Sequence, residues 1–576
     1  MTESAFALPA IVLVTVVTLV IGAYGVRFAR TTSDFLVASR TVSPAWNASA
    51  ISGEYLSAAS FLGVAGLVMK YGADVLWYPV GFTAGYLAML LYVAAPLRRS
   101  GAFTLPDFAE ARLGSGRIRL LCAAFVVLIG WLYLVPQLQG AGLTLGTVTG
   151  APYWLGAVVV GVVVTANVAT GGMRSITFVQ AFQYWLKLTA LAVPAFFLLL
   201  VWQAGGTGSL TADDVPVFPA ETTVDVQVDV TVSVLEPVSL VAVGVVDGAA
   251  VDGPLRWESG RHDIAQGAEL RFPAGAPVPH ADQLDAVGNN TWATPLGTGG
   301  GHPEFPLFAT YSLILATFLG TMGLPHVLVR FYTNPDGRAA RRTTLLVLAL
   351  LGVFYLFPTV YGALGRLYTP QLLLTGQTDA AVLLLPGAAI GGLGGQLLGA
   401  LVAAGAFAAF LSTSSGLLVS VAGVLSTDVV GRGSVAAFRG AAAVAGIVPL
   451  VLALQVVSLD VSVVVGLAFA VAASTFCPLL VLGIWWRGLT DVGAAAGLLA
   501  GGLLSIAAVL ITVLGGARAG WLGVLLAQPA ALTVPVAFAV MIVVSRLTAV
   551  RVPVDIGRIM VALHAPESLG VHRRTT

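Results

Sequence analysis

The sequence predicts an all-α polytopic membrane protein with about thirteen transmembrane helices. Three observations predict it. Of the 576 residues, 57% are hydrophobic and only 10% are charged, long apolar segments recur along the chain, and two of these segments carry helix-breaking residues at matching positions. A bilayer core of about 30 Å is crossed by a helix of about 20 apolar residues. The net charge of +1 gives no electrostatic case for binding nucleic acid.

Thirteen apolar segments are candidates for spanning helices. They lie at about 6–27, 44–69, 73–97, 118–147, 152–172, 176–202, 306–331, 343–365, 392–425, 436–457, 461–486, 491–514 and 522–546. With the N-terminus outside, 21 of the 28 Lys and Arg residues fall on the cytoplasmic side and six fall outside. Arg27 and Arg30 follow the first span, whereas in a cleaved signal peptide the basic residues precede the apolar run. We therefore expect a multi-pass protein of the cell (plasma) membrane with a cytoplasmic C-terminus.

These segments divide the chain into six parts. The parts are an extra N-terminal helix with a cytoplasmic loop (1–43), a first repeat with core helices 1 to 5 (44–202), an acidic extracytoplasmic insert (203–305), a second repeat with core helices 6 to 10 (306–486), two peripheral helices (487–546) and a cytoplasmic tail (547–576). The chain has only two lysines, Lys70 and Lys187, and the wealth of Ala, Val and Gly is typical of a GC-rich bacterial genome.

The insert at 203–305 differs from the rest of the chain because it is polar and acidic. It carries fourteen Asp and Glu residues against three Arg. Residues Thr223–Val234 alternate between polar and apolar with period two, which predicts a half-buried strand. Trp257, Phe272 and Trp292 are candidates for a small core. We expect a short β-rich unit; a solvated acidic loop and a cation-concentrating vestibule are the alternatives.

The second span contains the first polar interruption. Ser52 and Gly53 weaken a helix, because glycine costs about 1 kcal/mol relative to alanine and a serine hydroxyl competes for backbone groups. Glu54 follows them as a carboxylate inside the membrane. A broken helix is tolerated at this depth only where it faces protein or a water-filled cavity.

Three further interruptions follow. Pro325, with Gly320 and Gly323 before it, predicts a second helix break, because proline lacks a backbone donor and clashes one turn back. The ninth span carries the hydroxyl cluster Ser412–Ser415, and the sixth span carries Gln180, Gln183 and Lys187.

The two expected breaks occupy corresponding positions. If the first span is left out, the breaks fall in core helices 1 and 6, the first helices of two five-helix halves. Because each half crosses the membrane an odd number of times, the two halves have opposite orientations. This is the plan of inverted-repeat transporters, which bind solute and ion where the broken helices meet. Unwound carbonyls and hydroxyls suit a hard monovalent cation, whereas free amides at a helix N-terminus suit a carboxylate. Ordinary kinks from Gly and Pro are the alternative.

Several stretches carry a family resemblance. They are Ile51–Gly63, Gly171–Arg174, Val179–Gln180, Gly320–Thr333, Phe476–Pro478 and Trp486–Gly493. In these stretches the chain resembles the sodium/solute symporter family, most of all its cation/acetate (monocarboxylate) branch, over about residues 34–200 and 306–500. The resemblance implies a five-plus-five inverted-repeat (LeuT-like) core with discontinuous helices 1 and 6. The insert departs from the short loop that is usual in the family.

The resemblance also implies a set of binding residues. Sodium would be held by Ala48, Ile51, Ala409, Ser412 and Thr413. The solute would contact Thr317, Thr321 and Pro325, and the breaks add Ser52, Gly53, Gly320 and Gly323 as candidates. Two hydroxyls in core helix 8 favour Na⁺ over H⁺. Ala50 and Gln180 replace acidic residues that some relatives carry.

Three polar residues inside the spans are candidates for ion coupling: Glu54, Gln180 and Lys187. An intramembrane carboxylate is a functional candidate by default. The structural alternative for Glu54 is a buried pair with Lys187 or a backbone cap. We expect His326 to satisfy a local backbone group, with ligation of the ion as the alternative.

The predicted function is secondary active symport, in which Na⁺ drives uptake of acetate, propionate or pyruvate, with Na⁺ as the coupling ion. The partners expected are a small carboxylate solute and the lipid bilayer, with no nucleic acid and no obligate protein partner. Symport of proline or a sugar with Na⁺ or H⁺ is one alternative, and a solute sensor or channel is another. No nucleophile elbow, phosphate loop or metal-ligand spacing supports an enzyme.

Overall fold

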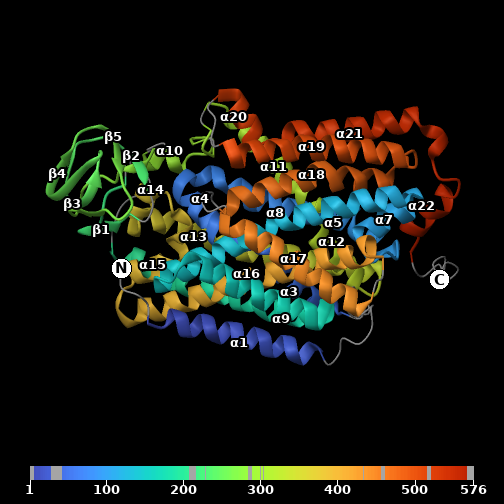
Figure 1. Cartoon of the computed structure of the whole chain (residues 1–576), viewed down its shortest axis with the longest axis horizontal. Coiled ribbons are helices and arrows are strands. Elements are labelled where there is room, and N and C mark those ends of the chain that lie inside the picture. The colour runs from blue at the N-terminus through green and yellow to red at the C-terminus, as the bar shows by residue number, and fades with distance from the viewer. Residues whose placement is uncertain are drawn as a thin grey trace.

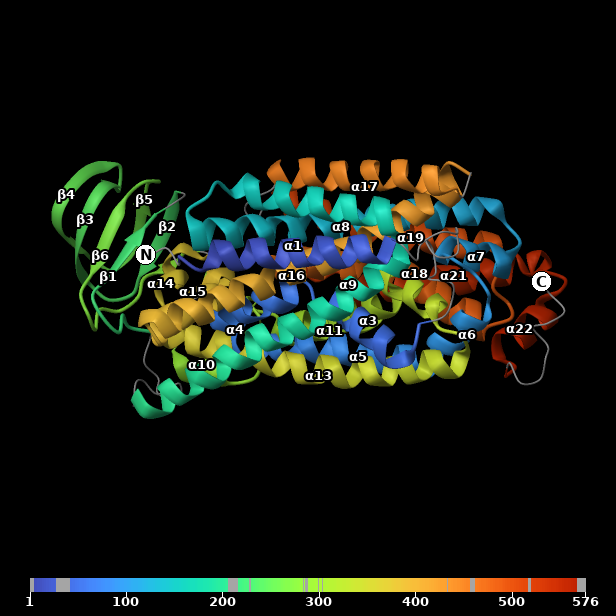
Figure 2. The ribbon, with the colours of Figure 1, turned by 90° about the horizontal axis from the view of Figure 1, so that it is seen from below.

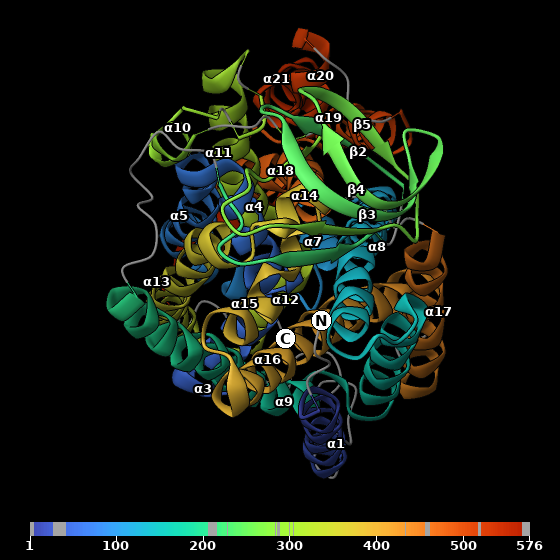
Figure 3. The same ribbon diagram turned by 90° about the vertical axis from the view of Figure 1, so that its left-hand side faces the viewer.

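The computed structural model describes residues 5–26, 42–205, 216–226, 229–282, 284, 288–298, 300–302, 304–431, 434–455, 461–515 and 520–566. Within them the chain forms an elongated bundle of long helices, with a β-sheet at one end and the C-terminal helix α22 (Ile556–His564) at the other, as Figure 1 shows. Figure 3 looks along the bundle from the end that the sheet covers. The expected combination of a helical membrane core with a small β-rich insert is confirmed.

The long helices follow the apolar segments. Their bounds are α1 Ala7–Val26, α5 Trp77–Tyr92, α8 Gly116–Thr149, α9 Tyr153–Gly205, α13 Gly337–Tyr368, α16 Gly392–Val424, α17 Val435–Gln455, α18 Val461–Trp485, α19 Asp491–Gly515 and α21 Ala530–Leu547. Helices α16 and α18 form the centre of the bundle, because most of their apolar residues are buried, whereas most of those in α1 are not. Helix α1 lies at the lower edge of the bundle in Figure 1 and on the face toward the viewer in Figure 2. Its exposed Leu13 and Val20 suit contact with lipid.

Short helices complete the described architecture. They are α6 Ala94–Arg99, α7 Leu105–Leu113, α10 Asn289–Ala293, α14 Gln371–Thr375, α15 Ala381–Ala389 and α20 Gly520–Ala527. Helix α22 closes one end of the bundle, where Arg99 Nη1 donates to the carbonyl of His564 at 3.2 Å. This part of the expected cytoplasmic tail is therefore docked on the protein.

Eleven helices in the described residues are long and apolar enough to cross a membrane. The expected count of thirteen stays a prediction, because two pairs of expected spans are continuous stretches here: Ala59–Tyr92 and Tyr153–Gly205. In α9 the chain changes direction at Gly172, whose φ of 56° and ψ of −161° are not helical. Only glycine adopts such a conformation without strain, so Gly172 permits two helices to follow each other without a loop.

The first expected helix break exists, but it lies beyond Ser52-Gly53. Helix α3 (Pro44–Tyr55) runs through both residues, and regular structure is lost at Leu56 and Ser57. A π-helical turn (Ala59–Gly63) and α4 (Val64–Tyr71) then continue the span. Ser52 and Gly53 stay helical because they are buried against α9, where tertiary contacts outweigh the weak helix propensity of glycine.

The second break occurs where proline predicts it. Helix α11 (Pro306–Gly323) ends before Leu324, which has an extended conformation, and α12 (Pro325–Val329) begins with the proline. A 3₁₀ turn, Arg330–Thr333, completes the span. Discontinuous core helices 1 and 6 are thus confirmed.

The insert folds as a seven-stranded antiparallel sheet. Its strands are β1 Thr222–Asp225, β2 Val230–Val234, β3 Val238–Val246, β4 Ala249–Trp257, β5 Gly260–Ile264, β6 Glu269–Phe272 and β7 His280–Ala281, in the order β1-β6-β3-β5-β2-β7 with β4 on β3. The alternating stretch gives two strands, β1 and β2, rather than one. Asp247 and Gly248, both with positive φ, close the β3–β4 hairpin, a role that Asp-Gly pairs favour.

The three aromatic residues expected in the insert core separate. Trp257 and Phe272 lie together, with ring centroids 6.0 Å apart. Trp292 instead lies in α10, outside the sheet, and donates from Nε1 to the carbonyl of Val68 in α4 at 2.7 Å. Nearby, Asp74 accepts from the amides of Leu296 and Thr298. These bonds attach the insert to the end of the first broken helix.

Candidate ion and solute site

The C-terminal end of α3 exposes carbonyl groups that lack intrahelical partners, as every helix end does. Lys187 of α9 satisfies two of them. Its Nζ donates to the carbonyl of Gly53 and to that of Leu56, the latter at 2.7 Å. A third bond runs from Nζ to Oγ of Ser412 in α16 at 2.8 Å. The side chain of Lys187 is fully buried, and all three of these partners are protein oxygens.

The hydroxyl cluster of α16 faces the same helix end. Ser412 Oγ donates to the carbonyl of Ala409 at 3.0 Å, which leaves its lone pairs free to accept from Lys187. Thr413 Oγ1 donates to the carbonyl of Glu54 at 2.6 Å. The expected set Ala409, Ser412 and Thr413 is thus brought against α3. Ala48 and Ile51 lie further back in the regular part of α3, where carbonyls accept intrahelical bonds.

The Glu54 side chain forms an ion pair with Arg330, not with Lys187. Oε2 of Glu54 accepts from Nε of Arg330 at 2.5 Å, and both side chains are buried. Arg330 also donates to Oγ1 of Thr177 at 2.9 Å and to Oε1 of Gln180. Arg330 lies directly after α12, so this pair joins the two broken helices.

Gln180 connects the ion pair with the hydroxyl cluster. While its Oε1 accepts from Arg330, its Nε2 donates to the carbonyl of Ser412 at 2.7 Å. The three candidates for ion coupling, Glu54, Gln180 and Lys187, therefore belong to one buried network. The methyl group of an alanine at Gly53 would overlap with the carbonyl of Gln180, so glycine is required for α3 to approach α9 this closely.

An aromatic cluster lies beside the break in α3. Tyr55, the last residue of α3, contacts Tyr86 at a centroid distance of 4.8 Å and Phe82 at 5.9 Å. Phe469 of α18 contacts Tyr55 and Tyr133. The hydroxyl of Tyr55 shares a hydrogen bond with Oγ1 of Thr321 at 2.8 Å. The cluster therefore spans the space between the two broken helices.

His326, the second residue of α12, borders this cluster. Its ring lies 5.3 Å from that of Tyr133, and the side chain is 1% exposed. Among the described residues neither ring nitrogen has a hydrogen-bond partner. The expectation that His326 satisfies a local backbone group is therefore wrong. A buried imidazole without partners is costly, which makes it a candidate for binding a polar ligand.

The expected solute residues of α11 are used mainly in helix packing. Thr317 donates to the carbonyl of Leu313 in its own helix at 2.8 Å. Gly320 and Gly323 permit close approach to the backbone of α18, where added methyl groups would overlap with the carbonyls of Phe469 and Ala472. Ser52 is buried, and its hydroxyl lacks a hydrogen-bond partner within the described part of the chain.

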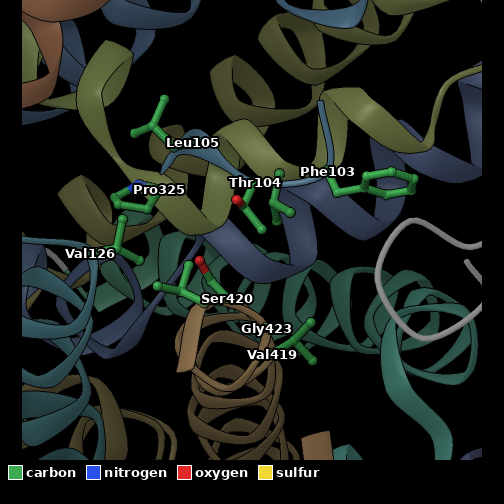
Figure 4. A pocket seen from close by; sticks show the side chains of 10 residues that line it. Phe103, Thr104, Leu105, Val126, Pro325, Val419, Ser420 and Gly423 are labelled. Atoms are coloured by element: carbon green, nitrogen blue, oxygen red, sulfur yellow. The ribbon is translucent and has the colours of Figure 1, made fainter. Parts of the chain in front are cut away.

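Pro325 lines a small cavity beside α12, shown in Figure 4. Its other walls are Thr104 and Leu105 at the start of α7, Val126 of α8 and Ser420 of α16. The cavity lies where α12, α16 and the chain before α7 meet, on the side that the arginine distribution assigns to the cytoplasm.

Arg330 is the residue that sequence reasoning misplaced. The positive-inside count assigns it to a cytoplasmic segment, whereas it is fully buried and paired with Glu54. The signal was present: a carboxylate inside a span requires a cationic partner. Arg330 lies only five residues after the proline break, so it was available at membrane depth.

Comparison with known proteins places the chain in a family. A family model described as the sodium:solute symporter family matches residues 35–250 and 298–501. An uncharacterized symporter, YwcA, of Bacillus subtilis is 30% identical over 506 residues, covering 86% of this chain and 84% of the relative. A monocarboxylic acid transporter of Corynebacterium glutamicum is 31% identical over 533 residues, covering 88% and 85%.

Two solved structures share the fold. A substrate-bound, outward-open Na⁺-coupled sialic acid symporter matches with a TM-score of 0.60 at 14% identity, covering 94% of this chain and 97% of that one. A nucleobase-cation-symport-1 family transporter in a closed conformation matches with a TM-score of 0.51 at 12% identity, covering 92% and 98%. Both are transporters. On the family model and the two relatives together, the chain belongs to the sodium:solute symporter family.

Proposed function

We propose that this protein imports a small monocarboxylate, of the acetate, propionate or pyruvate class, by symport with Na⁺. The observation that carries the proposal is the meeting of two broken helices around a buried polar network. Such breaks provide unpaired carbonyls and amides at membrane depth, the recurring ion and solute sites of inverted-repeat transporters. The monocarboxylic acid transporter among the relatives supports the choice of solute class.

Sodium would be coordinated where α3 ends against α16. The carbonyls of Gly53 and Leu56, the hydroxyls of Ser412 and Thr413 and the carbonyl of Ala409 supply five oxygens. Oxygen ligands without a net charge suit a small hard monovalent cation. Ala48 and Ile51 lie earlier in α3 and would be ligands in a state in which α3 unwinds further.

The solute would lie between the aromatic cluster and the start of α12. A short carboxylate needs hydrogen-bond donors at one end and apolar surface at the other. The imidazole of His326 provides a donor, and the rings of Phe82 and Phe469 provide the apolar wall. The hydroxyls of Tyr55 and Thr321 are already hydrogen-bonded to each other beside this space. Ser52, Gly53, Thr317, Gly320, Gly323 and Pro325 would shape this space through helix packing.

Coupling follows if both ligands stabilise the same arrangement of α3 against α16 and α12. The Glu54–Arg330 pair links the two breaks, so a cation bound at the end of α3 changes the position of α12. Each ligand should then tighten the binding of the other, because coupling free energies are reciprocal.

The test is uptake of ¹⁴C-acetate by the purified protein in proteoliposomes. An inward Na⁺ gradient at equal pH should accelerate uptake relative to an equal K⁺ gradient, and unlabelled propionate and pyruvate should compete. Uptake driven only by a pH gradient would show that H⁺, and not Na⁺, is the coupling ion. Uptake indifferent to both gradients would refute symport, and competition by proline or glucose alone would refute the monocarboxylate.

A further inference from the structure

Lys187 occupies the position at which the coupling ion is expected. Its Nζ contacts the carbonyls of Gly53 and Leu56 and the hydroxyl of Ser412, which are three of the five oxygens proposed above for sodium. The family resemblance and the relatives assign no role to this lysine. The inference rests on the proposed function, since it concerns the same site.

The acceptors around this lysine match its charged form. Both carbonyls can only accept, and the hydroxyl of Ser412 uses its own hydrogen on the carbonyl of Ala409. Three acceptors therefore converge on one nitrogen, and an ammonium group has three N–H donors to match them. The arrangement is that of a charged, fully hydrogen-bonded cation attached to α9 by its side chain.

The charged groups nearby disfavour a second cation at this position. Glu54, the carboxylate of α3 next to Gly53, is already paired with Arg330. Helix α16 contributes no ionisable side chain between Gly392 and Val424. With Lys187 charged, the network carries one net positive charge, and sodium at the same oxygens would add a like charge in a buried site, where charges are weakly screened.

We propose that Lys187 is a built-in competitor of the coupling ion: its ammonium group holds the ion position in the ion-free state, and sodium binds there only when this side chain withdraws. The hydrogen bonds of the Lys187 side chain keep the break in α3 ordered while no ion is bound. They also set the sodium affinity, because every sodium ion must displace an ammonium group that is already hydrogen-bonded.

The experiment measures sodium binding by purified protein in detergent at one fixed pH, from the Na⁺-dependent rise in Tm with choline as the control cation. Lys187→Met, which keeps the length of the side chain without its charge, should bind sodium at least tenfold more tightly than the wild type. Lys187→Gln should shift in the same direction, and it provides a second neutral variant if the first does not fold. Lys187→Arg keeps the charge and should stay at the wild-type affinity or weaker.

A matched control is Gln183→Met, which removes a buried polar group one turn away on the same helix, where it contacts Thr18 of α1. It should leave the sodium affinity unchanged. Equal sodium affinity in the wild type and both neutral variants would overturn the inference while Na⁺-coupled transport still stands. Sodium binding that appears only in the neutral variants would support the inference and refute Na⁺ coupling in the native protein. No sodium binding in any form would overturn both.

Discussion

The two helix breaks solve the same structural problem with different chemistry. At the end of α3 the free carbonyls accept hydrogen bonds from side chains of other helices. Lys187 donates to the carbonyls of Gly53 and Leu56, and Thr413 donates to that of Glu54. At Leu324 the chain turns through a single extended residue, and Pro325 leaves no unsatisfied N–H there because proline has none. The first break is held by hydrogen bonds and charge, and the second by proline and glycine packing.

This difference assigns different roles to the two breaks. The first presents oxygen atoms, which hold the amino group of Lys187 and which we propose as ligands of Na⁺. The second presents His326, whose ring nitrogens have no partner in the described residues, and it faces aromatic side chains. A cation and an anion can therefore bind at neighbouring but separate places. The Glu54–Arg330 pair connects them.

The largest effect is expected from breaking that connection. Arg330→Met leaves the buried Glu54 carboxylate without its cation, and removing one partner of a buried ion pair costs about 3–5 kcal/mol. The thermal unfolding of the variant, followed by fluorescence-detected gel filtration, should show a marked fall in Tm. Adding Glu54→Gln to Arg330→Met should recover most of the loss, since no buried charge is then unpaired. A single variant as stable as the wild type would show that the pair does not link the two breaks.

The next effect concerns the cation side alone. Ser412→Ala with Thr413→Ala removes both hydroxyls that face the end of α3. Each lost hydrogen bond in a buried site costs about 1–3 kcal/mol. The Na⁺ concentration for half-maximal acetate uptake should therefore rise at least tenfold, while the KM for acetate at saturating Na⁺ changes much less. An unchanged Na⁺ requirement would remove α16 from the ion site.

A smaller effect is expected on the solute side. His326→Ala removes the one imidazole at the second break, and a hydrogen bond to a charged group contributes about 1.5–3 kcal/mol. The KM for acetate should rise by about tenfold or more, with the Na⁺ requirement unchanged. His280→Ala, at a buried histidine of the insert, serves as the control and should transport like the wild type. An equal rise in KM and in the Na⁺ requirement would contradict separate sites.

The sequence was sufficient for the plan of the fold. Composition predicts a polytopic membrane protein, and Pro325 identifies the second break to within a residue, because proline acts through its own backbone. The break in α3 was predicted a few residues early. Its position depends on long-range contacts, such as the bond from the amide of Ala58 to Oε1 of Gln137. No local pattern contains that information.

The site was predictable in its parts and not in its connections. Glu54, Gln180 and Lys187 stand out because polar groups inside a membrane are rare. Which cation neutralises Glu54 could not be read from the sequence, since Arg330 and Lys187 are both within an apolar run or at its end. The pairing follows from the crossing of α3, α9 and α12, a property of the packed bundle.

If the protein transports as proposed, both helix breaks must face a common path for solute and water. The most direct measurement is the labelling of Ser57→Cys and Leu324→Cys by a charged thiol reagent in intact membranes, since Cys122 and Cys477 are buried. Leu13→Cys on the exposed face of α1, at 63% exposure, is the lipid-facing control and should not react. We predict that both break cysteines react and that Na⁺ with acetate protects them. Cysteines that fail to react, or that react without protection by the two ligands, would contradict the account.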